Sequence, residues 1–250
     1  MAPLLEIREV SRAFGGVMAL NRLSLTLAEG ELACIIGPNG CGKTTLFNVV
    51  TGAIPPSAGE VRFRGERITG LSRHEIARRG ILRKFQVPGV YPTLTVLENL
   101  EVPLSAMAGR RGPLALLAHR PVGADLAELL ARFNLAEEAG QPAGALAHGK
   151  KQWLEIAMLL AGEPRLLLLD EPTAGMTGPE AAATGELVMR LQSERGMAVL
   201  VIEHNMDFVQ RLGCRVMVMM RGAVFCEGSY EEVQRNPAVR EGYLGRVAAC

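Results

Sequence analysis

The segment Gly37-Pro38-Asn39-Gly40-Cys41-Gly42-Lys43-Thr44 is the most informative stretch of this 250-residue chain. It follows an apolar run, Leu32 to Ile36, that suits a buried central strand, and it leads into a helix candidate, Lys43 to Val50. Glycines let backbone N–H groups curl around an anion without Cβ clashes, and the start of a helix adds positive potential. The pattern GxxxxGK followed by Ser or Thr therefore predicts a cradle for nucleotide phosphates, in preference to a turn that only caps a helix.

Single side chains of this loop have separate predicted roles. Lys43 supplies a point charge to the β- and γ-phosphates, the Thr44 hydroxyl suits Mg²⁺, and Thr45 belongs to the same cradle. Cys41 is open to two interpretations. A thiol at a helix N-terminus can have a lowered pKa and be reactive; the alternative is a small residue that simply fits the loop.

Two more apolar runs end in residues that suit the chemistry of a phosphate. Leu166 to Leu169 is followed by Asp170 and Glu171, and buried carboxylates need a partner, for which the Mg²⁺ of a nucleotide is suited. We expect Asp170 to hold the metal through its water shell and Glu171 to orient or polarise the attacking water. Val199 to Ile202 ends in Glu203-His204. A histidine there is usually structural, but ligands bind beyond the carboxyl ends of such strands, which would aim His204 at the γ-phosphate.

Composition excludes other classes of protein. The net charge of +1 gives no strong field toward nucleic acid or an anionic membrane, so no nucleic-acid partner is expected. The five cysteines are scattered without a CxxC pair, which favours reduced thiols over disulfides or a zinc site. No apolar run reaches the ~18–20 residues of a membrane span, and acidic residues stand where a signal peptide has its apolar core. We therefore expect a cytosolic protein.

The remaining pattern predicts an α/β organisation. Strict alternation at Leu23 to Leu27 and again at Val61 to Arg64 indicates half-buried strands. Thr95 to Ala136 is largely helical, and Gly178 to Arg195 is a helix that precedes the strand ending at Ile202. Strands that alternate with helices predict a mainly parallel sheet, here with a helical segment inserted into it.

Taken together, these residues resemble the ATPase subunits of ABC transporters. Phe14 stands where that family has an aromatic residue that stacks on adenine, and Gln86 matches the Q-loop residue, which contacts Mg²⁺ and senses the membrane domain. His204 matches the switch histidine. The family's signature motif falls at Leu146-Ala147-His148-Gly149-Lys150. The resemblance covers nearly the whole chain, and its motifs occur in the family's order.

The resemblance implies an α/β fold with a P-loop ATPase core, a mixed sheet with flanking helices, an N-terminal antiparallel β portion and an inserted α-helical subdomain. It implies one domain over 1–250, in which 1–86 and 150–250 form the RecA-like core and 87–149 the helical signature subdomain. ATP and Mg²⁺ would be the ligands. The implied metal-binding residues are Thr44, Gln86 and Asp170.

The family also implies partners. Its members work as a sandwich dimer, in which the phosphate loop of one chain binds ATP and the signature of the other closes over the γ-phosphate. The region from Gln86 to Leu100 would contact integral membrane permease subunits, and a substrate-binding protein would act indirectly. The chain would then be cytoplasmic and peripheral on the inner face of the plasma membrane.

The signature departs from the usual LSGGQ. Ala147 replaces the serine that hydrogen-bonds the γ-phosphate, and Lys150 replaces the glutamine. A lost charge-assisted hydrogen bond costs roughly 1.5–3 kcal/mol unless Lys150 compensates. We therefore expect a heterodimer with a second, related ATPase, with a homodimer as the alternative. Thr177 also stands where many relatives carry an aspartate.

Details of the sequence narrow the subgroup. The stretch from His148 to Ile156, together with Arg83-Lys84-Phe85-Gln86 and Ala174 to Thr177, resembles importers of branched-chain amino acids and, among these, the first ATPase of the urea importer. Urea or a short-chain amide is the predicted substrate, with branched-chain or other amino acids as the alternative. Rival classes are a P-loop kinase or GTPase, a non-transport ABC protein and a weakly active assembly subunit. A P-loop kinase or GTPase would lack the signature helix. Non-transport ABC proteins usually have long coiled coils or two ATPase units in one chain.

Overall fold

The computed structural model describes residues 3–84, 89–108 and 122–241. The strands are β1 (Leu5–Phe14), β2 (Val17–Leu27), β3 (Leu32–Ile36), β4 (Ala58–Phe63), β5 (Glu66–Arg67), β6 (Ile81–Lys84), β7 (Leu166–Asp170), β8 (Ala198–Ile202), β9 (Arg215–Met220) and β10 (Ala223–Gly228). The helices are α1 (Lys43–Val50), α2 (Arg73–Arg78), α3 (Val96–Ala108), α5 (Val122–Arg132), η2 (Ala143–Ala145), α6 (His148–Ala161), α7 (Gly178–Arg195), α8 (Met206–Leu212), α9 (Tyr230–Arg235) and α10 (Pro237–Val239).

The central layer of the described residues is a six-stranded sheet in the order β10-β9-β3-β8-β7-β6. Strands β9, β3, β8, β7 and β6 run parallel, and β10 returns antiparallel as a hairpin on β9. All residues of β7 and β8 are buried because α6, α7 and α8 cover one face and α1 with the strands β1 and β2 covers the other, which explains their continuous apolar sequence. The turn of this hairpin is Arg221-Gly222, between β9 and β10.

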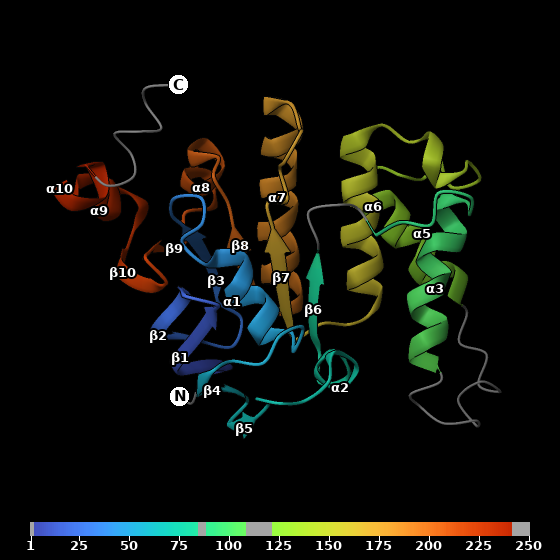
Figure 1. The fold of residues 1–250 in the computed structure, drawn as a ribbon. Helices are drawn as coiled ribbons and strands as arrows, with labels where there is room; N and C mark the ends of the chain where they lie inside the picture. The colour runs from blue at the N-terminus through green and yellow to red at the C-terminus, as the bar shows by residue number, and fades with distance from the viewer. Residues whose placement is uncertain (1–2, 85–88, 109–121, 242–250) are drawn as a thin grey trace.

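A second, antiparallel sheet has the order β2-β1-β4-β5 and contains the first two strands of the chain (Figure 1). The alternation at Leu23 to Leu27 is confirmed, and β2 extends back to Val17. Strand β1 was not predicted, because Arg8 and Glu9 are two successive charged residues that break its alternation, at a point where the strand pairing is irregular. These side chains are not buried, while Leu5, Ile7 and Val10 face the core.

Helices α3, α5 and α6 gather at the end of the molecule next to β6, on the opposite side from the C-terminal helices α9 and α10 (Figure 1). The predicted α/β fold, with a mixed sheet, flanking helices and an N-terminal antiparallel portion, is confirmed. Helix α6 begins at His148, so the boundary predicted at 149–150 falls in its first turn. None of the helices in the described residues combines the length and apolar character that crossing a bilayer requires.

Candidate active site

The carboxyl ends of three neighbouring strands bring the predicted chemistry to one edge of the sheet. Ile202 of β8 is in register with Ile35 of β3 on one side and with Asp170 of β7 on the other. The pairing continues past the strand ends, because the Glu171 N–H donates to the Ile202 carbonyl at 2.9 Å. The phosphate loop, the two acids and His204 therefore emerge side by side.

Glycine is required by geometry at two points of the loop. Gly37 has a φ of 152°, and a Cβ built there would lie 2.2 Å from the Met219 carbonyl oxygen. Gly42 has a φ of 105°, and its Cβ would lie 2.2 Å from the Ala19 oxygen of the β1–β2 hairpin. Gly42 is also the N-cap of α1 and has no side chain to bond the first amides of the helix. The loop thus presses against β2 and β9 and presents backbone donors, as an anion site needs.

Lys43 is held across the loop. Its Nζ donates to the carbonyls of Gly37 at 2.8 Å and Pro38 at 3.0 Å. Burial lowers the pKa of the Lys43 ammonium, while Cys41, Glu171 and Asp170 oppose the shift. A buried cation with two fixed contacts is positioned in advance for phosphate oxygens.

Cys41 is buried, and burial raises the pKa of its thiol in spite of the nearby Lys43. A raised pKa leaves little thiolate at neutral pH. The geometry thus favours the interpretation of Cys41 as a small residue that fits the loop over that of a reactive thiol.

Asp170 has one carboxylate oxygen engaged and one without a partner. Oδ2 accepts a hydrogen bond from Arg83 NH2 at 2.6 Å. Oδ1 is buried and has no hydrogen-bond partner among the described residues, on a side chain that is 1% exposed. A buried carboxylate oxygen without a donor fits the oxygen and water coordination of Mg²⁺. Thr44, exposed in the first turn of α1, has the hydroxyl that such a site would add.

Glu171 and His204 face each other beyond the strand ends. His204 Nε2 lies 3.3 Å from Glu171 Oε1, and both side chains are about one-third exposed. Burial lowers the pKa of His204, with Lys43 adding to the effect and Glu171 opposing it. The imidazole is then neutral at neutral pH, and its Nε2–H can donate to the carboxylate. Glu171 has a φ of 49°, a strained value for a residue other than glycine.

The buried Glu203, which the sequence analysis did not single out, fixes this turn. Its carboxylate accepts from the Thr173 N–H and hydroxyl, at 2.9 and 2.6 Å, and from the backbone N–H groups of His204 and Asn205, at 2.8 and 3.1 Å. The turns after β7 and β8 are therefore tied together. Glu203 could have been predicted by the rule applied to Asp170, because it also stands at the end of a buried strand.

The signature segment contacts the turn after β7. His148 Nε2 lies 3.1 Å from the Ala174 carbonyl oxygen, and a Cβ on Gly149 would clash with Glu180. Ala147 is the N-cap of α6 and has no side-chain capping bond. Lys150 Nζ forms an ion pair with Glu138 of the same chain. The lysine charge is therefore already neutralised within the chain.

Phe14 and Gln86 are two further residues of the predicted site. Phe14 ends β1, is 46% exposed and has the Arg12 guanidinium 4.8 Å from its ring centroid. An exposed ring at the end of the hairpin that abuts Gly42 is suited to stacking. Gln86 lies outside the described residues.

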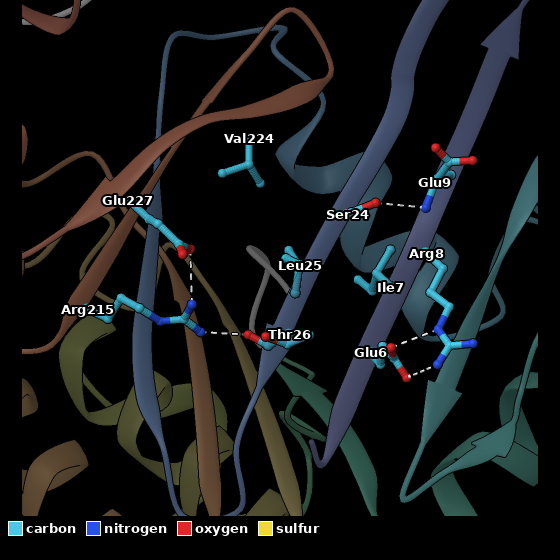
Figure 2. A pocket seen from close by; sticks show the side chains of 10 residues that line it. All are labelled: Glu6, Ile7, Arg8, Glu9, Ser24, Leu25, Thr26, Arg215, Val224 and Glu227. Atoms are coloured by element: carbon cyan, nitrogen blue, oxygen red, sulfur yellow. Dashed lines mark hydrogen bonds and ion pairs between the residues drawn. The ribbon is translucent and has the colours of Figure 1, made fainter. Parts of the chain in front are cut away.

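A surface hollow between β1, β2 and the β9–β10 hairpin does not offer comparable chemistry (Figure 2). Its charged side chains are paired: Arg8 with Glu6 at 2.7 Å, Arg215 with Glu227 at 3.0 Å, and Glu9 with Arg22 outside the wall at 2.7 Å. Arg215 also donates to the Thr26 carbonyl. These charges are already satisfied, so we assign the hollow no catalytic role.

Comparison with known protein families gives two matches. The ABC transporter family matches residues 20–174, and the family described as branched-chain amino acid ATP-binding cassette transporter matches residues 223–249. The first match spans the phosphate loop, Asp170 and Glu171.

Individual known proteins are similar to this chain over most or nearly all of its length. BraF, a high-affinity branched-chain amino acid transport ATP-binding protein of Pseudomonas aeruginosa, is 38% identical over 252 residues, covering 98% of this chain and 99% of BraF. The solved ADP conformation of an ATP-binding cassette of an ABC transporter has a TM-score of 0.84 at 30% identity, covering 98% of this chain and 100% of that one. A dimeric cassette in a post-hydrolysis state bound to ADP and phosphate has a TM-score of 0.76 at 26% identity, covering 90% and 98%.

Proposed function

Because this chain belongs to the ATP-binding proteins of ABC transporters, which hydrolyse ATP to drive transport, we propose that it energises an importer of branched-chain amino acids. The substrate class is supported by the match of residues 223–249 to a family of such transporters and by the similarity to BraF. This favours amino acids over the urea that the sequence details suggested first.

The observation that carries the catalytic part is the meeting of Lys43, Asp170, Glu171 and His204 at one sheet edge. Lys43 and the loop amides would bind the β- and γ-phosphates. Asp170 and Thr44 would hold Mg²⁺, which neutralises phosphate charge when bound. Glu171 would orient the attacking water, and the neutral His204 would hold Glu171 and face the γ-phosphate.

We further propose that the chain pairs with a second ATPase and docks on membrane permease subunits, with a substrate-binding protein delivering the cargo. The region around residues 89–100, with Gln86 before it, would meet the permease. The chain would thus lie on the inner face of the plasma membrane. The dimeric relative, and the exposure of Ala147 and His148 in the signature segment, support the pairing.

The signature predicts unequal ATP sites. Because Ala147 has no hydroxyl and Lys150 is paired with Glu138, neither side chain replaces the missing serine contact. The site closed by this signature should hydrolyse ATP at least about tenfold more slowly than the other site, as expected for the loss of a charge-assisted hydrogen bond. The measurement is single-turnover hydrolysis in the purified complex, with the catalytic glutamate of one ATPase, then of the other, replaced by glutamine. Equal rates would contradict the asymmetric heterodimer.

Urea or a short-chain amide remains the second candidate, favoured by the residues from His148 to Glu155. The substrate is tested on the native complex with its binding protein. Leucine should stimulate ATP hydrolysis, whereas urea should leave it at the basal rate. Stimulation by urea alone would overturn the amino acid proposal and leave the ATPase assignment intact.

A further inference from the structure

Arg83 is a buried cation that contacts two elements of the nucleotide site, α1 and β7. It lies on β6, and its side chain is 4% exposed. Its NH2 donates to Asp170 Oδ2 at 2.6 Å, and its NH1 donates to Asn48 Oδ1 on α1 at 2.7 Å. The guanidinium also lies 5.4 Å from the ring centroid of Phe47. The helix that follows the phosphate loop is thereby linked to the proposed metal-holding strand.

The two contacts use a property that only arginine offers. A planar guanidinium directs separate N–H groups at two acceptors in a fixed geometry, whereas a lysine ammonium is a flexible point charge. Arg83 supplies a counter-charge for the buried Asp170 and also fixes the rotation of its carboxylate. With Oδ2 held, Oδ1 is the oxygen left for a metal or its water. The strand of Arg83 ends at Lys84, two positions before Gln86.

We propose that Arg83 is a positioning residue for the magnesium site, holding Asp170 in the orientation that presents Oδ1 and locking that orientation to α1 through Asn48. The inference rests on the proposed ATPase function and deepens it. Partners that orient metal-binding groups typically change metal affinity by about 10–100-fold when mutated. Mutation of Arg83 should lower the Mg²⁺-dependent part of the ATP affinity and leave the affinity of the phosphate loop for ATP without metal unchanged.

The experiment is calorimetric titration of the full-length chain with ATP, in Mg²⁺ and in EDTA. Arg83→Lys keeps the charge and loses the fork, and Asn48→Ala keeps the ion pair and loses the second contact. Each should reduce the enhancement of ATP affinity by Mg²⁺ by about tenfold, with affinity in EDTA within about twofold of wild type. The double variant should lose little more than either single change, because both remove one linkage.

The matched control is Arg215 at the start of β9, which also directs separate N–H groups at two acceptors, Glu31 at 2.8 Å and Glu227 at 3.0 Å, at the opposite end of the strands. Arg215→Lys keeps the charge, loses the fork and should preserve the Mg²⁺ enhancement. Wild-type enhancement in both Arg83→Lys and Asn48→Ala would overturn the inference, as would an equal loss of affinity in EDTA. If the unmodified chain binds no ATP under either condition, the ATPase proposal itself fails, which is a distinct result.

Discussion

Replacing Glu171 with glutamine should lower ATP turnover of the assembled transporter by about a hundredfold or more, while MgATP binding is retained. Glutamine is nearly the same size as glutamate but cannot accept a proton from, or polarise, the attacking water. Position 171 has a strained backbone conformation and lies beside His204. Because glutamine has nearly the same shape as glutamate, the substitution removes the charge with little change of packing. Removing a group that assists proton transfer typically costs about 10²–10⁴ in rate.

The measurement is phosphate release by the purified complex, with ATP occupancy followed separately. The variant should accumulate in an ATP-bound, dimerised state because binding continues and cleavage does not. Glu137→Gln, an exposed glutamate after α5, is the matched control and should retain wild-type turnover. An undiminished transport rate in the Glu171→Gln variant would contradict this prediction and would favour the alternative that the chain only helps to assemble the complex.

Replacing Lys43 with alanine should weaken MgATP binding by about a hundredfold, which corresponds to about 3 kcal/mol for losing charge-assisted contacts to phosphate. The ammonium is buried and bonded to the Gly37 and Pro38 carbonyls, so its position is set before nucleotide arrives. Alanine leaves the helix α1 and the loop glycines in place. The loss should therefore be electrostatic and should not reflect unfolding.

Equilibrium binding of ATP to the isolated chain measures this effect, with circular dichroism to check the fold. Lys151→Ala on α6 removes the same charge from a half-buried position that has no predicted role in the chain's own phosphate site. It should bind ATP like the unmodified chain. Equal affinities for ATP in Lys43→Ala and Lys151→Ala would show that the loop lysine does not hold phosphate.

The sequence was most informative where chemistry and secondary structure coincide. A glycine-rich loop after an apolar strand, and acids directly after another, place Lys43 and Asp170 at strand ends without knowledge of the strand order. Parallel strands share a carboxyl edge, so these groups converge in any such sheet. Strand β1 was not predicted because its alternation is broken where Arg8 and Glu9 follow each other, at an irregularity of the strand.

Long-range pairing was beyond the reach of the sequence. Arg83 and Asp170 are 87 positions apart, and nothing local to Arg83 indicates that its fork joins two elements. The engagement of Lys150 by Glu138 likewise depends on how the segment before α6 packs. The transported molecule is a different kind of problem, because none of the residues argued to act on ATP reads it. Comparison with whole relatives therefore supports the proposal of amino acids over urea.

The most direct test of the central claim is calorimetric titration of the purified, unmodified chain with MgATP. We predict saturable binding of one nucleotide per chain well below millimolar concentrations. The absence of any binding at millimolar MgATP, by a chain that is folded and monodisperse, would contradict the proposal that residues 37–45 hold the triphosphate.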